Sequence, residues 1–389
     1  MNGSLAGGTS HNAFGRIEMP TAYEAWIDRW KGVLIFLVVL GHVVGGGYHL
    51  ASATVQPSLK LIYKTIYFFH MPAFFLVAGY TFRDMQGKRY LLRKIRRLIV
   101  PYFAFGIASV VVYAFTADIA NASFSAYATT GRYTGQSASV AVNWIRPLVS
   151  LLHGGGWPDG EGFRSNSVLW FLPCMFSTMM IFRLVFRLGG VALVVAAFSS
   201  LTLDWACVIP PGLPWGLSKV AGYLPYVILG NGLARVGWMH HDIRGKGRLG
   251  SAILLLSVVY FVVSAFSPDP TVMRDAWRGH LALYLFGFVG CLMSAGIAKV
   301  TGGRFLMALG ASSLGIMLLH KFLVLGAELK LSAVRLLISR STASAIAVSI
   351  GLSLVVSVLC LVLVIPIRKF MPWALGERSD ELFRSDRTP

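Results

Sequence analysis

Long apolar runs recur along almost the whole 389-residue chain, and most of them approach the roughly 20 residues that a helix needs to cross a bilayer. Hydrophobic residues make up 56% of the sequence and charged residues only 13%, whereas soluble domains carry about a quarter charged residues. The pattern predicts an all-α polytopic membrane protein with about ten transmembrane helices around an intramembrane cavity. The expected spans lie near residues 31–47, 61–82, 98–117, 167–186, 188–209, 217–239, 249–267, 280–298, 305–325 and 341–365.

The net charge of +19 is distributed unevenly among the segments between these spans. With the N-terminus inside, the cytoplasmic segments hold about twice as many Lys and Arg residues as the outer segments, which is the usual bias of membrane proteins. Both termini are therefore expected in the cytoplasm, and the expected location is a bacterial cytoplasmic (inner) membrane. No basic globular domain or recognition motif accompanies the charge, so membrane lipids rather than nucleic acid are the expected surroundings.

The apolar runs divide the chain into three parts: a polar N-terminal segment 1–27, a membrane domain 28–366 with a long outer loop 118–166, and a polar tail 367–389. The first residues lack a basic start followed by an apolar run and a small-residue cleavage site, so we expect a permanent first helix rather than a removable signal. The four cysteines show no CxxC or Cys/His spacing, and no metal site is expected.

Three histidines lie within apolar runs, where an imidazole needs a polar partner. His42 ends the stretch "DRWKGVLIFLVVLGH", and Lys31 precedes it by eleven residues, which places both side chains within about 20° on one helix face and about 16 Å apart along it. His70 lies two residues before Pro72, which interrupts helical hydrogen bonding. His320 ends "GASSLGIMLLH". One such histidine often only bonds a neighbouring helix, but three of them favour a functional site.

The stretch "RDMQGKRYLLRKIRRLIVPY" concentrates basic residues between two expected spans. Arg89, Arg93, Arg96 and Arg97 share one helix face and Lys94 lies beside it, so an amphipathic interfacial helix is able to present several cations to a polyphosphate. Cytoplasmic charge bias and anionic lipid headgroups produce similar runs, so this second interpretation stays open.

Several of these stretches together resemble one family, the acyltransferase-3 integral membrane acyltransferases, and in particular the branch similar to fucose 4-O-acetylases and other surface-sugar O-acetyltransferases. The resembling stretches, in chain order from about residue 28 to 320, are "DRWKGVLIFLVVLGHV", "FFHMPAFFLVAGY", "RKIRRLIVPY", "LWFLPCMF" and "LGASSLGIMLLH". The family usually has arginine where Lys31 stands, followed by a glycine such as Gly32. Lysine keeps the cation but loses the bidentate binding of phosphate. In having lysine at this position, the sequence resembles the fucose-acetylase branch.

The resemblance implies an acyl-CoA donor, usually acetyl-CoA, on the cytoplasmic side and an acceptor hydroxyl on a lipid-linked or exported glycan. Transfer of an acetyl group to a hydroxyl needs a base, and burial favours neutral imidazole, so we expect His42 to act as that base. An acetyl group carried covalently by His42 is an alternative route. The roles open to the other two histidines are orientation of His42, acceptor binding and oxyanion stabilisation. The predicted residues are His42, His70 and His320 for catalysis and Lys31, Arg93, Lys94, Arg96 and Arg97 for binding the donor.

A multi-pass transporter or flippase for a polar substrate is the alternative from another class, because buried histidines also line transport pathways. Such a protein moves its substrate without consuming acetyl-CoA. Many transporters also contain an internal two-fold repeat, which this sequence does not show.

Overall fold

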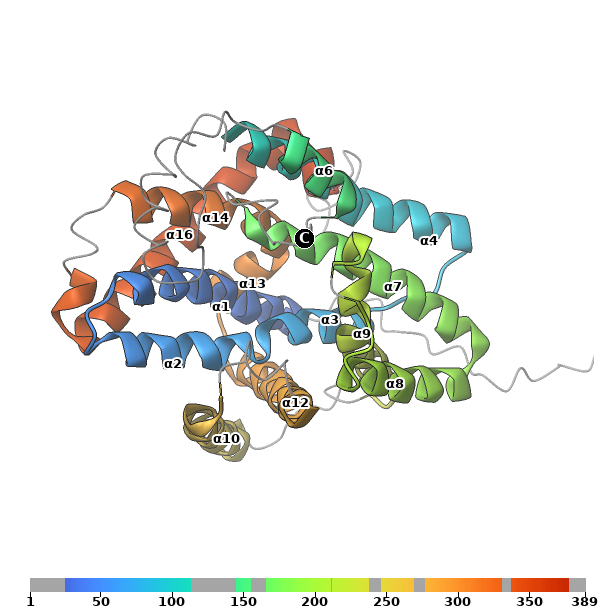
Figure 1. Ribbon diagram of the computed structural model, residues 1–389, viewed down its shortest axis with the longest axis horizontal. Helices are drawn as coiled ribbons and strands as arrows, with labels where there is room; N and C mark the ends of the chain where they lie inside the picture. Colours follow the sequence, from blue (N-terminus) through green and yellow to red (C-terminus); the bar gives the residue numbers. More distant parts are fainter. Residues whose placement is uncertain are drawn as a thin grey trace, which may run out of the picture.

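The computed structural model shows a bundle of packed helices (Figure 1). Every regular element among the residues that it describes is a helix. The described residues are 25–112, 145–154, 166–210, 212–237, 246–268, 277–330 and 337–377.

Helix α1 (Ala25–Leu50) lies at the centre of the packing. It contacts α2 (Gln56–Tyr67), α3 (His70–Tyr80), α12 (Trp277–Val300), α13 (Arg304–Ala311), α14 (Ser313–Lys330) and α16 (Thr342–Phe370). Trp30 and Leu34 of α1 are almost completely buried, and the Trp30 indole donates a hydrogen bond to Ser294 Oγ at 2.9 Å. A helix surrounded on so many sides holds its polar residues at a fixed place in the core.

Helices α2 and α3 form one interrupted span, Gln56–Tyr80. The interruption falls at Phe68 and Phe69, and Phe69 has non-helical backbone angles (φ −132°). Pro72 has no backbone N–H for the carbonyl four residues earlier, which agrees with an irregular turn just before it. The predicted interruption beside His70 is therefore present in the structure.

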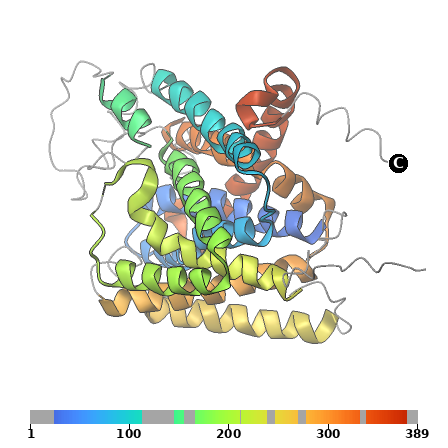
Figure 2. The ribbon, with the colours of Figure 1, turned by 90° about the vertical axis from the view of Figure 1, so that its right-hand side faces the viewer.

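A second layer contains α7 (Phe171–Leu188), α8 (Gly190–Trp205) and α9 (Leu217–Arg235). Helices α7 and α8 are joined at Gly189, whose φ of +104° is a conformation that glycine adopts most easily. Helix α9 crosses α3 closely. Gly79 permits this crossing, because the backbone of Val227 occupies the space that a side chain at this position would need. Figure 2 shows α10 (Lys246–Phe266) and α12 lying side by side along one edge of the molecule.

The basic run begins a longer helix than expected. Helix α4 (Gly87–Lys94) continues through a π-helical turn, Ile95–Ile99, and the whole helical stretch reaches Val112. The basic run is helical, as predicted, but it forms one helix with the apolar residues that follow, because the backbone does not break between them. The π turn also rotates the residues after it, so the face predicted for Arg89, Arg93, Arg96 and Arg97 is not that of a regular helix.

Part of the predicted outer loop 118–166 is helical, since α6 spans Ile145–His153. Leu151 of α6 is buried against Gly106, and its carbonyl accepts a hydrogen bond of 2.8 Å from the Tyr102 hydroxyl. Residues 118–144 and 155–165 of this loop, and most of the terminal segments 1–27 and 367–389, lie outside the described residues.

Five helices in the described part of the chain are long and apolar enough to cross a membrane, and a sixth span results if two bent helices are joined. The five are Gln56–Tyr80, Gly87–Val112, Ser167–Leu188, Gly279–Val300 and Thr342–Phe370. The bent pair is α13 with Ser313–Val324 of α14, at an angle of 85°. The predicted ten spans are not confirmed: residues 31–47, 188–209, 217–239 and 249–267 fall outside this set, and α8 has only 16 residues.

The outer surface of the bundle carries many large apolar side chains. Val191 and Phe198 of α8, Phe266 of α10 and Ile365 of α16 each expose more than 60% of their area. Exposed apolar residues of this size over several helices are typical of surfaces that face hydrocarbon. Together with the long apolar helices, they identify an integral membrane protein.

Candidate functional site

The predicted histidines meet in the structure although they belong to three different helices. The His42 ring on α1 lies 5.2 Å, between ring centroids, from the His320 ring on α14. Tyr67, the last residue of α2, stands between His42 and His70. Its hydroxyl lies 3.4 Å from His42 Nδ1, and its ring centroid lies 4.7 Å from that of His70. We call His42, Tyr67, His70 and His320 the histidine cluster.

His70 is held by the interruption that follows α2. Its Nδ1 donates a hydrogen bond of 2.8 Å to the carbonyl of Ile66, a carbonyl near the end of the broken helix. The ring is only 3% exposed. Because the donor must carry the proton, the neutral ring has its lone pair on Nε2, and this nitrogen is the one able to accept a proton.

His320 is held in the same way. Its Nδ1 donates a hydrogen bond of 2.9 Å to the carbonyl of Ile316, one turn earlier in α14. Its Nε2 is completely buried and has no hydrogen-bond partner among the described residues. A buried acceptor without a partner costs about 1–3 kcal/mol, so such a group is typical of a position that a bound molecule satisfies.

Asn166 adds a polar group near His320 that the sequence did not single out. Asn166 is completely buried, and its Nδ2 donates a hydrogen bond of 3.0 Å to the carbonyl of Leu318, two residues before His320. It stands at the N-cap of the short helix Ser167–Trp170 but does not cap that helix. Only the packing of this turn against α14 brings the two positions together.

Tyr67 was also missed, although a local signal exists. It precedes His70 by three residues, a spacing that places both side chains on one face of a helix. What the sequence does not show is that the same tyrosine also reaches His42 on α1.

Lys31 lies between Asp28 and Gly32, the two positions where α1 packs closely against α13. Its Nζ forms an ion pair of 2.8 Å with Asp28, one turn earlier in α1. Gly32 and Gly310 allow this approach, since side chains there would meet the backbone of Leu306 and Asp28. The cation predicted to line the donor entry is therefore paired with a carboxylate at this crossing.

The predicted donor-binding residues lie on α4 and its π turn. Arg93 donates a hydrogen bond to the Met85 sulfur at 3.4 Å, and the Lys94 ammonium lies 5.4 Å from the centre of the Tyr90 ring. Arg93, Lys94 and Arg96 are partly buried, whereas Arg97 is exposed. The backbone of Arg96 and Arg97 packs against Gly376, just beyond the C-terminal end of α16, which gives this segment a fixed position.

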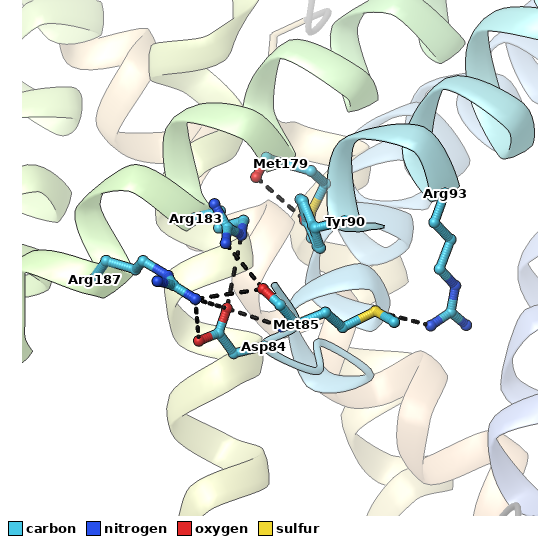
Figure 3. Close-up of polar contacts among 7 residues, drawn as sticks. All are labelled: Asp84, Met85, Tyr90, Arg93, Met179, Arg183 and Arg187. Carbon is cyan, nitrogen blue, oxygen red and sulfur yellow. Dashed lines mark hydrogen bonds and ion pairs between the residues drawn. The ribbon is translucent and has the colours of Figure 1, made fainter. Parts of the chain in front are cut away.

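Two arginines of α7 bind the segment that leads into α4 (Figure 3). Arg187 forms an ion pair of 3.1 Å with Asp84, and Arg183 approaches the same carboxylate at 3.7 Å. Arg183 also donates a hydrogen bond of 2.9 Å to the carbonyl of Met85. We call Asp84, Arg183 and Arg187 the arginine cluster. It fixes the start of the basic helix against α7.

Comparison with known proteins gives one match. The family model described as an acyltransferase domain, of the acyltransferase-3 type, matches residues 24–364. No curated protein and no solved structure matches the chain. The matched region contains all four residues of the histidine cluster and the whole basic run.

Proposed function

The chain belongs to the acyltransferase-3 family, and on this premise we propose that it moves an acetyl group from cytoplasmic acetyl-CoA to a hydroxyl group of a surface or lipid-linked glycan. Membership of the family makes it a membrane acyltransferase. The acetyl donor, the glycan acceptor, the fucose 4-O-acetylase-like branch and the inner-membrane location with both termini inside are the further content of the proposal.

The observation that carries the proposal is the histidine cluster. Imidazoles from three helices come together, since Tyr67 contacts His42 and His70 and the His42 ring lies beside that of His320. Two of the rings, His70 and His320, are fixed with Nδ1 as the hydrogen-bond donor. Fixed imidazoles of this kind suit general base catalysis, because the nitrogen that accepts the proton has a defined position. A purely structural role needs only the one hydrogen bond that each ring makes through Nδ1. Such a role gives no reason for the second nitrogen of His320, Nε2, to be buried without a partner among the described residues.

In the proposed reaction His42 removes the proton of the acceptor hydroxyl, whose oxygen attacks the thioester carbonyl of acetyl-CoA. The tetrahedral intermediate then breaks its carbon–sulfur bond, and the proton passes to the leaving thiolate. If His42 instead takes the acetyl group first, its nitrogen forms a bond to the acetyl carbon as the carbon–sulfur bond breaks. The acceptor oxygen then displaces that nitrogen, and the hydroxyl proton passes to the CoA thiolate. His320 and His70 lie close enough to His42 and Tyr67 to orient the base or to bind the acceptor.

For the donor, we assign the nucleotide phosphates to Arg93, Lys94, Arg96 and Arg97, with Lys31 at the entry to α1. The fixed position of the basic segment between α7 and the end of α16 supports this assignment, because preformed cations bind a polyphosphate at less cost in entropy. Replacement of the exposed Arg97 by alanine is expected to raise the KM for acetyl-CoA, whereas Arg89→Ala serves as a control with equal loss of charge. Equal KM values for both variants would assign the run to membrane topology alone.

The experiment that tests the proposal uses the purified full chain with labelled acetyl-CoA and a set of candidate glycan acceptors. Both CoA release and label in the acceptor are measured, for the wild-type chain and for His42→Ala. Label in a glycan together with stoichiometric CoA release is the expected result. Movement of a labelled sugar across vesicles without CoA release would contradict the proposal and favour a transporter.

A further inference from the structure

Apart from the histidine cluster, the structure brings a thiol, an imidazole and a carboxylate together where α8 meets α12. Asp204 lies in the last turn of α8, Cys207 lies two residues beyond the end of that helix, and His280 lies in the first turn of α12. Cys207 Sγ is 3.9 Å from His280 Nε2, and Asp204 Oδ2 is 3.4 Å from His280 Nδ1. None of these residues belongs to the predicted catalytic or donor-binding set.

Asp204 holds its place by a second contact with the same helix. The Tyr284 hydroxyl, one turn after His280 in α12, donates a hydrogen bond of 2.9 Å to Asp204 Oδ2. The approach of Asp204 to His280 has the distance of an ion pair but not the alignment of a hydrogen bond, so it acts through charge. A carboxylate at this distance orients the imidazole that accepts the proton from the thiol.

Cys207 reaches His280 through an unusual backbone conformation. Its φ is +54°, a region that residues other than glycine rarely adopt and that stores strain. The other end of the contact is well fixed, because His280 is only 7% exposed. Cys207 is also the one exposed cysteine of this chain, since Cys174, Cys291 and Cys360 are buried.

We propose that Cys207, His280 and Asp204 form a nucleophilic thiol site that exchanges with the disulfide of an oxidised low-molecular-weight thiol, so that Cys207 becomes reversibly S-thiolated. The Cys207 proton passes to His280 Nε2, and Sγ attacks one sulfur of the disulfide. The sulfur–sulfur bond of the reagent breaks, a new one forms to Cys207, and the leaving thiolate takes the proton from His280. One disulfide is consumed and one formed, so no further oxidant is needed.

The arrangement fits a disulfide better than other ligands of a thiol–imidazole pair. Among the described residues no three His, Cys, Asp or Glu side chains gather in the way that a metal ion requires, and Asp204 faces the far nitrogen of the imidazole. An acyl substrate needs donors for an oxyanion, and attack at a disulfide sulfur needs none. A thiol, a base and an orienting carboxylate are sufficient for exchange.

The test uses the purified full chain with oxidised glutathione as the disulfide. Adduct formation is followed by intact mass and located by peptide mapping, and dithiothreitol reverses it. We expect a single adduct at Cys207, formed about fivefold or more faster than in His280→Gln, which lacks the base. His153→Gln makes the same substitution on α6 and is expected to leave the rate unchanged.

Two further variants separate loss of the base from loss of the fold. Asp204→Asn keeps an oxygen for the Tyr284 hydrogen bond but removes the charge, and an intermediate rate is expected. Cys207→Ser is expected to form no adduct. Equal rates in the wild-type chain and His280→Gln, both eluting as the native chain in size-exclusion chromatography, would overturn the proposal, as would adducts at the buried cysteines at the same rate. Acyl transfer is not part of this measurement, so its outcome is independent of the proposed function.

Discussion

The histidine cluster and the arginine cluster are both polar and both join separate helices, yet they differ in how their geometry is fixed. The rings of His70 and His320 are completely or almost completely buried, and carbonyls of their own helices hold them. In the arginine cluster the side chains of Asp84 and Arg187 are 36% and 51% exposed, and they contact each other as charges. Water and salt screen such a pair, whereas a buried imidazole keeps one orientation. We therefore propose the first region for the chemistry and the second for attachment of the basic helix.

The largest expected effect comes from His42→Ala, which removes the proposed base from the histidine cluster. Acetyl transfer is expected to fall by at least about 100-fold, the usual range for loss of a general base. Label in the acceptor and CoA release are the measurements, with size-exclusion elution as the control for folding. Normal amounts of acetylated product from a folded variant would refute the role assigned to His42.

Lys31→Ala is expected to act on the donor rather than on the chemical step. Removal of the cation is predicted to raise the KM for acetyl-CoA about tenfold with a smaller change in kcat, a loss of uniform binding. Asp28→Asn is the matched control, because it breaks the same ion pair but keeps the cation. A KM that rises equally in both variants would indicate that only the ion pair matters.

Tyr67→Phe tests whether the tyrosine belongs to the cluster as more than packing. The variant keeps the ring but loses the hydroxyl 3.4 Å from His42 Nδ1. Loss of one hydrogen bond of about 1 kcal/mol corresponds to a fall in kcat of about fivefold. Tyr63→Phe removes the hydroxyl of the neighbouring stacked ring and serves as the comparison. The two variants should differ in kcat; the same value for both would place Tyr67 outside the machinery.

Arg187→Ala is expected to have the smallest effect. Its ion pair with Asp84 is exposed, so the unfolding free energy should fall by less than about 1 kcal/mol. Arg183→Ala should cost more, because that guanidinium is less exposed and also holds the Met85 carbonyl. Thermal unfolding of both variants at low and high salt measures the difference. A larger effect for Arg187 would contradict the contrast between exposed and buried groups.

Local patterns in the sequence were sufficient for several parts of this protein. Helical class, membrane location, the interruption before His70 and the family follow from apolar runs, Pro72 and short motifs. The number of spans does not follow in the same way. Hydropathy marks where a segment is apolar, but it does not fix where the helix begins and ends, as α8 shows with 16 residues.

The continuous helix from Gly87 to Val112 illustrates a second limit of the sequence. Basic and apolar residues in succession read as two elements, an interfacial helix and a span, because their solvent preferences differ. The backbone has no reason to break there, since neither proline nor glycine separates Lys94 from Val100. A π turn takes up the change of face instead.

By itself the sequence determined which residues are unusual for a membrane: three histidines, a lysine on the same helix face as one of them, and a basic run. The tertiary structure alone decided that His42 lies beside His320, that Tyr67 joins His42 to His70, and that Asn166 reaches the carbonyl of Leu318. The physical reason is one of range. Burial and periodicity are properties of neighbouring residues, whereas contacts between positions 42 and 320 exist only once several helices have packed against α1.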